Sequence, residues 1–109
     1  MRLLISFLII AVISIGINAH ASVYKGQKEY MKICKVCHGS GTKVSKAKTT
    51  DEWIELFANN ASMLKKIHIK DKNAMKYLNS KRFEKKKKHL LDFFKKYAAD
   101  SGNVPACSD

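Results

Sequence analysis

An almost unbroken apolar segment, Leu3–Ile17, opens the chain and limits how much of its 109 residues can form a folded domain. Arg2 precedes this segment, and Ala19-His20-Ala21 follows it with the small residues that a signal peptidase site requires. The segment is also short of the roughly 20 apolar residues that span a bilayer comfortably. The pattern predicts a cleaved signal peptide, 1–21, and a periplasmic location; an uncleaved membrane anchor is the less favoured alternative.

Cleavage there would leave residues 22–109, a chain of 88 residues that is marginal for an unaided hydrophobic core. Small domains of this kind usually add disulfides, a metal or a cofactor to their core. Three cysteines lie in this segment, Cys34, Cys37 and Cys107, and an odd number cannot form a complete disulfide framework. The composition therefore points to a cofactor as the further source of stability.

The apolar residues of the exported segment recur with helical periodicity, and no stretch alternates as a half-buried strand would. We therefore predict an all-α fold, with one domain over 22–101 and a surface tail over 102–109. Thr49 and Glu52 form a capping-box pattern at the end of a polar loop expected over 40–50. The expected helices lie at about 23–36, 50–60, 61–68, 71–78 and 81–99.

The segment Cys34-Lys35-Val36-Cys37-His38 has the C-x-x-C-H spacing of a c-type haem attachment site. Two thiols three positions apart on a helical turn can reach the two vinyl groups of one haem and form thioether bonds. His38 is then placed to bind the iron from the proximal side. Covalent attachment would retain haem c in a domain too small to enclose it fully.

Three other uses of these cysteines remain open on the sequence alone. A thioredoxin-like C-x-x-C pair would need a surrounding strand–helix unit, and no strand pattern precedes Cys34. A zinc site needs four ligands, and Cys107 with a histidine would complete one only at irregular spacing. A disulfide between Cys34 and Cys37 would leave the adjacent His38 unexplained. Covalent haem explains all three residues of the motif.

The stretch 26–41, GQKEYMKICKVCHGSG, resembles the opening of a small monohaem cytochrome c. That family has a glycine and an aromatic residue on the helix ahead of C-x-x-C-H, and here these are Gly26 and Tyr30. The resemblance implies a helical domain wrapped around one covalent haem, in which the last helix crosses the first near this pair. An apolar stripe of the last helix supplies the expected partners: Leu90, Phe94 and Tyr97.

The distal iron ligand cannot be carried over from the family, because this chain has no Met-Pro loop before its last helix. His68 is the first candidate, since it lies on the apolar face of the helix expected at 61–68. Met75 and Met63 are the alternatives, and each also fits as core filler. His89 follows four lysines and fits a solvated face better. An open or water-bound distal site is the remaining arrangement.

The chain carries 21 Lys and Arg against 9 Asp and Glu, a formal net charge of +12 that falls by one when Arg2 is cleaved away. Much of this excess lies between Lys65 and Lys88. An exported protein rarely meets nucleic acid, so the charge predicts an acidic redox partner protein, with an anionic membrane surface as the second target. Long-range attraction speeds the encounter with such a partner without requiring a tight complex.

These features predict a periplasmic electron carrier rather than an enzyme. It would pass single electrons from a membrane quinol-oxidising complex to a terminal reductase or oxidase. The segment 97–102 resembles the end of haem domains that serve N-oxide or S-oxide reductases, which makes such a reductase one expected acceptor. The alternative is a haem-based gas sensor or a small peroxide-active haem protein with an open distal site.

Overall fold

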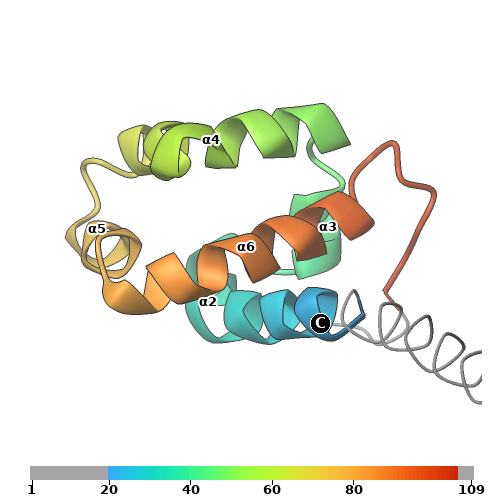
Figure 1. Ribbon diagram of the computed structural model, residues 1–109, viewed down its shortest axis with the longest axis horizontal. Coiled ribbons are helices and arrows are strands. Elements are labelled where there is room, and N and C mark those ends of the chain that lie inside the picture. Colours follow the sequence, from blue (N-terminus) through green and yellow to red (C-terminus); the bar gives the residue numbers. More distant parts are fainter. Residues whose placement is uncertain (1–19, 106–109) are drawn as a thin grey trace, which may run out of the picture.

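The computed structural model describes residues 20–105, which form helices joined by short connections and contain no strand (Figure 1). The first helix includes the described residues 20–33, and five further helices follow it within the described part of the chain. They are α2 (Lys35–His38), α3 (Gly41–Ser45), α4 (Thr50–Ile67), α5 (Lys72–Leu78) and α6 (Lys81–Lys96). The prediction of an all-α fold is confirmed.

The predicted signal peptide falls almost wholly on 1–19, outside the described residues, as does the end of the predicted tail, 106–109, with Cys107. Between residues 20 and 105, no helix has both the length and the apolar character needed to span a membrane. The described part of the tail follows Ser101 along the surface, where the Lys46 ammonium donates to the Asn103 carbonyl at 2.8 Å.

Each of the last three helices begins after a residue whose side chain accepts a backbone N–H three positions later. These residues are Thr49 before α4, Asp71 before α5 and Ser80 before α6. The first amides of a helix have no partner within it, so such caps determine where a helix starts. The capping pattern at Thr49 therefore predicted the start of α4 correctly.

The prediction of a polar loop over 40–50 is wrong for its first half, because the chain forms α3 there. The Ser40 side chain accepts the Lys43 N–H, and the carbonyl of Ser45 accepts the indole N–H of Trp53 at 2.9 Å. Gly41 is the first residue of α3, whereas Gly39 has a positive φ of 72° and ends α2. A contact with Trp53 thus helps to hold a turn whose own residues are mostly polar.

The boundary expected between helices near Asn59-Asn60 lies inside α4 as a sharp break. Ala58 has an extended ψ of 158°, and the next three residues have positive φ values of 54° (Asn59), 57° (Asn60) and 55° (Ala61). The helix resumes after them and continues to Ile67. We call 58–61 the left-handed turn.

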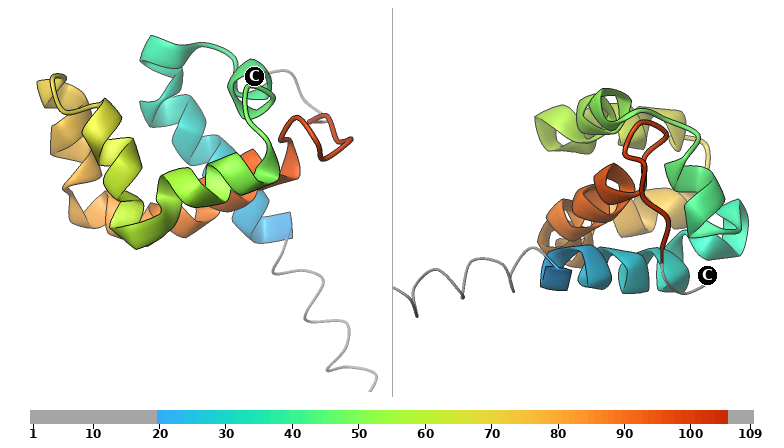
Figure 2. Two further views of the ribbon diagram at one scale, coloured as in Figure 1. Left: turned by 90° about the horizontal axis from the view of Figure 1, so that it is seen from above. Right: turned by 90° about the vertical axis from the view of Figure 1, so that its right-hand side faces the viewer.

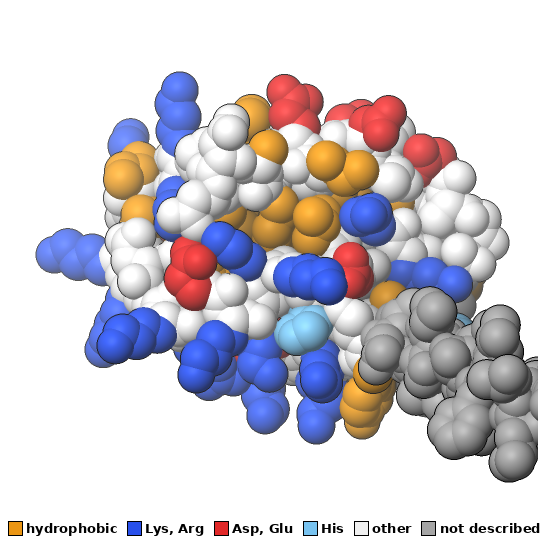
Figure 3. Space-filling view, in the orientation of Figure 1, with side chains coloured by type: hydrophobic (Ala, Val, Ile, Leu, Met, Phe, Trp, Pro, Cys, Tyr) orange, Lys and Arg blue, Asp and Glu red, His pale blue; other side chains and the backbone are white. Residues whose placement is uncertain are grey.

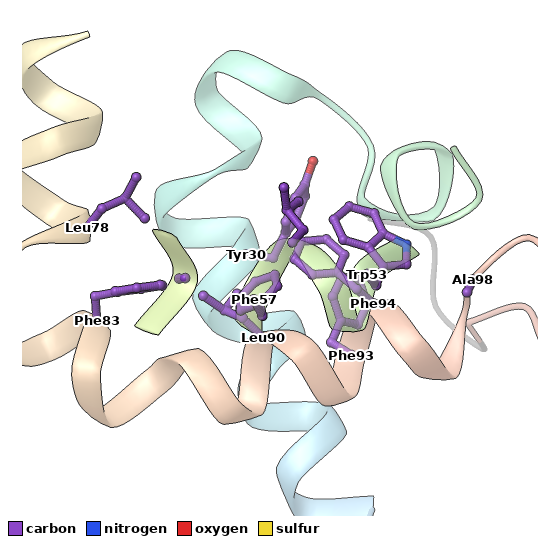
Figure 4. Close-up of a cluster of buried hydrophobic side chains, with 11 residues drawn as sticks. Tyr30, Trp53, Phe57, Leu78, Phe83, Leu90, Phe93, Phe94 and Ala98 are labelled. Atoms are coloured by element: carbon purple, nitrogen blue, oxygen red, sulfur yellow. The ribbon is translucent and has the colours of Figure 1, made fainter. Parts of the chain in front are cut away.

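The core is built on α6, which supplies four buried side chains, Phe83, Leu90, Phe93 and Phe94 (Figure 4). Trp53 of α4 stacks on Phe94 with ring centres 4.1 Å apart and planes 8° from parallel. Tyr30 of the first helix meets Phe94 edge-on at 5.7 Å. Phe94 therefore ties the first helix and α4 to α6.

The first helix crosses α6 at Gly26. A Cβ at this position would overlap the carbonyl oxygen of His89 and lie 2.9 Å from the Cβ of Phe93. Only a residue without a side chain allows the two backbones to approach so closely. The crossing implied by the family resemblance is present at Gly26 and Tyr30.

We predict that Gly26→Ala lowers the free energy of unfolding by about 2–3 kcal/mol, because the added methyl group must push the two helices apart. Denaturant unfolding followed by helical circular dichroism measures this change. Lys28→Ala, an exposed substitution on the same helix, is the control and should change the free energy by less than about 0.5 kcal/mol. Equal stability of the two variants would contradict the close crossing.

Candidate functional site

A largely apolar cavity of about 550 Å³ lies among the first helix, α2 and α3 on one side and α4, α5 and α6 on the other. Figure 2, seen from above, shows α2 facing the end of α4 and α5 across this region. The volume falls within the range of about 300–1,000 Å³ that is typical of ligand and cofactor sites. The side chains that form much of its wall are Tyr30, Trp53, Leu56, Phe57, Leu64 and Phe94.

All three residues of the C-x-x-C-H motif line this cavity. Cys34 lies at the junction between the first helix and α2, and Cys37 and His38 follow on the single turn of α2. The hydroxyl of Tyr30 donates to the carbonyl of Gly39 at 2.7 Å, which fixes the backbone directly after the motif. The helix crossing therefore controls, through Tyr30, where His38 is held.

His68 lies opposite His38, with ring centres 5.8 Å apart and planes 74° from parallel. Its Nδ1 is 2.7 Å from the carbonyl oxygen of Leu64. Because a carbonyl only accepts, this contact requires the proton on Nδ1 and leaves the lone pair of Nε2 free to bind a metal. The C-terminal end of α4 thus presents an oriented imidazole to His38.

The two alternative ligands, Met75 and Met63, do not line the cavity. The side chain of Met63 is 46% exposed, and Met75 is half-buried and packs against the apolar core. The structure therefore brings His68 to His38 and leaves both methionines elsewhere.

The donor set and the cavity fit a haem c. Two imidazoles that bind one metal from opposite sides have ring centres about 6 Å apart, because each metal–nitrogen bond is about 2 Å long. The distance between His38 and His68 matches this arrangement. Haem needs only two ligands from the protein, since the porphyrin occupies the other positions on iron. In the described part of the chain, no three His, Cys, Asp or Glu side chains are grouped to hold a metal ion between them.

An ion pair between a buried carboxylate and a half-exposed guanidinium lies beside the cavity, and the sequence analysis missed it. The side chain of Glu29 is 2% exposed, and its Oε1 is 2.8 Å from both Nε and Nη2 of Arg82, which brings α6 to the first helix. Tyr77, a residue of the cavity wall, has a raised pKa. Burial of its hydroxyl is the larger cause, and the negative charge of Glu29 adds to it. Glu29 could have been found from its position three residues after Gly26, on the side of the helix that faces α6.

Burial raises the pKa of the Cys34 thiol to about 12, and the negative charges of Glu29 and Cys37 add to the effect. The thiol therefore stays protonated across the physiological range. The pKa of this thiol in the folded protein lies above its ordinary value of 9.0. The buried thiol therefore contributes fully to the free energy of unfolding below about pH 9, and this contribution is lost as the pH rises toward 12.

A second, more open hollow of about 700 Å³ adjoins the histidine pair. It is bordered by His38 and His68 together with Lys70, Asp71 and Lys72. Two lysines of the basic segment predicted between Lys65 and Lys88 therefore flank the candidate ligands. In Figure 3 the acidic side chains gather mainly over α4 along the upper edge, whereas Lys and Arg dominate the lower and left margins.

Comparison of the chain with protein families, curated proteins and solved structures finds no match. The functional argument therefore rests on the chemistry and geometry of the site.

We predict that, in protein produced with free thiols, a thiolate-selective alkylating reagent at pH 8 modifies Cys37 at least tenfold faster than Cys34. The reason is that a thiol with a pKa of about 12 is ionised in only about one molecule in 10,000 at pH 8. Peptide mapping by mass spectrometry separates these residues from Cys107. The control is the same reaction in denaturant, where the two rates should converge; equal rates in the folded protein would contradict the assigned environment.

Proposed function

We propose that this protein is an exported monohaem c-type cytochrome that carries single electrons. In this proposal Cys34 and Cys37 would hold the haem through thioether bonds, and His38 and His68 would bind its iron. The haem, when bound, supplies one-electron redox chemistry at its iron. The observation that carries the proposal is the 5.8 Å approach of two histidines, 30 positions apart in the sequence, at the cavity that the motif lines.

The apolar wall of the cavity would shield a bound haem from water on the side that it covers. Trp53 and Phe57 of this wall are buried, and their rings stack on Phe94 and pack against it at a tilt, respectively, which restricts their movement. The hydrogen bond from His68 to the Leu64 carbonyl fixes the orientation of the distal imidazole. Fixed ligands in a largely apolar site would reduce the rearrangement that accompanies the gain or loss of an electron.

The position of His68 favours an electron carrier over the open-site alternative. Two protein ligands would fill both axial positions, which leaves none for a gas or for peroxide. Histidine in place of methionine at the distal position also lowers the haem potential. Such a potential suits transfer from a membrane quinol-oxidising complex to a reductase, and the resemblance of 97–102 makes an N-oxide or S-oxide reductase one proposed acceptor.

The proposed partners are acidic redox proteins of the periplasm, with an anionic membrane surface as a second target. Lys70 and Lys72 border the hollow beside the two histidines, so their charges lie next to the proposed ligands. Positive charge at this place would orient an acidic partner toward the haem during their encounter. Export to the periplasm rests on the signal peptide predicted over 1–21.

We predict that His68→Ala abolishes the low-spin optical spectrum of the oxidised protein while its covalent haem remains. The substitution removes the distal nitrogen but neither thioether cysteine. His89→Ala is the matched control, because His89 contacts Ser22 of the first helix and does not line the cavity. Met75→Leu serves as a second control. An unchanged low-spin spectrum in His68→Ala, or its loss in Met75→Leu, would assign the distal position to another group.

We predict that oxidation of the reduced protein by ferricyanide, an anion, slows at least severalfold between low and physiological ionic strength, because salt screens the attraction. At low ionic strength, Lys70→Gln/Lys72→Gln should slow the reaction more than Lys43→Gln/Lys96→Gln. Both variants lose two positive charges, but only the first pair borders the hollow beside the histidines. Equal slowing by the two variants would remove the local role assigned to Lys70 and Lys72.

A further inference from the structure

We infer that Asn60 and Lys87 position His68, by clamping the left-handed turn of α4 to α6 so that the distal imidazole stays over the cavity. This inference rests on the proposed function. It assigns a role to two polar residues outside the C-x-x-C-H motif, neither of which contacts the cavity.

The left-handed turn is costly and therefore needs support from its surroundings. Positive φ values are tolerated by asparagine but are uncommon for alanine, and Asn59, Asn60 and Ala61 all adopt them in succession. Ala61 is also completely buried, so the core restricts its position as well. Strained backbone of this kind persists only where neighbouring structure holds it, and it is often found at functional sites.

The turn determines where His68 lies. An uninterrupted α4 would continue along the axis of its first half, which carries the Trp53 contact with Phe94. The turn instead redirects the second half of the helix, and His68 at its end then faces His38. We call 62–68 the distal arm, because it carries the proposed distal ligand.

The distal arm itself has few buried contacts. Met63 is 46% exposed and Ile67 is 64% exposed, and Leu64 is only half-buried against the core and the cavity. An arm with so little buried surface depends on the turn that precedes it for its direction. A contact that holds the turn should therefore affect the ligand at the end of the arm.

A hydrogen bond joins the turn directly to α6. The ammonium of Lys87 donates to Oδ1 of Asn60 at 2.7 Å, and it is also 2.9 Å from Oε2 of Glu84, one turn earlier on α6. Glu84 thereby orients Lys87 toward the turn. Because α6 also crosses the first helix at Gly26, the clamp connects the distal arm to the helix that leads into the haem motif.

The clamp should control how often the distal site opens. If Lys87 or Asn60 no longer holds the turn, His68 spends more time away from the iron, and an added ligand competes more successfully. Loss of one such hydrogen bond corresponds to about a fivefold larger open population. Carbon monoxide binding to the reduced haem protein measures this population, since it requires a vacant axial position.

The experiment compares Lys87→Met and Asn60→Gly with wild type and with Lys88→Met. Lys88→Met removes the same charge from the neighbouring exposed position of α6, and glycine at position 60 keeps the positive φ while removing the amide oxygen. We expect carbon monoxide to bind about fivefold faster to both clamp variants, but at the wild-type rate to Lys88→Met. The double variant should match the single variants, because both remove the same contact.

A merely structural role would give a different result. Lys87→Arg keeps a cationic donor at this position, so carbon monoxide should bind to it as slowly as to wild type. The covalent haem content should be the same in every variant, whereas a general loss of structure would lower it. Wild-type rates in Lys87→Met and Asn60→Gly, with His68 established as the ligand, would overturn the inference and leave the proposed function intact. A wild-type protein without covalent haem, or with a distal ligand other than His68, would overturn both.

Discussion

The close crossing of the first helix and α6 is the constraint on which the rest of the structure depends. Gly26 lets the two backbones meet, and Tyr30, one turn later, then packs against the aromatic residues of α6. The same tyrosine donates to the Gly39 carbonyl after the C-x-x-C-H motif. A single interhelical contact thus provides the core of a small domain and fixes the segment that carries the proposed haem ligand His38.

The second half of the site comes from α4, which approaches the same helix from another side. Its first half is fixed by the stacking of Trp53 on Phe94, and its second half is redirected by the left-handed turn. The result is a cavity that remains largely apolar although the described chain is rich in lysine. Charged side chains lie near the site in two places: Lys70 and Lys72 border the hollow beside the histidines, and the buried Glu29 carboxylate pairs with the half-exposed Arg82.

Local patterns in the sequence predicted the elements whose causes are local. Helical periodicity and the Thr49 cap predicted the all-α fold and the start of α4, and the apolar face of 61–68 turned His68 toward the cavity as expected. Local sequence patterns could not predict features that depend on residues far apart in the chain. The turn of α3 is held in part by the indole of Trp53. In the sequence, Lys87 is one of four consecutive lysines, and only the structure shows that it contacts Asn60. The haem itself remains a proposal that the motif and the histidine pair support.

The central claim is that one haem is attached covalently to Cys34 and Cys37 of the exported protein. The intact mass of the protein, purified from a host that exports it and attaches haem to c-type cytochromes, tests this claim most directly. The account predicts the mass of the polypeptide from Ser22 onward plus one haem, with the haem retained on the peptide that contains both cysteines after proteolysis. A mass equal to that of the bare polypeptide, or of the polypeptide with a Cys34–Cys37 disulfide, would contradict it.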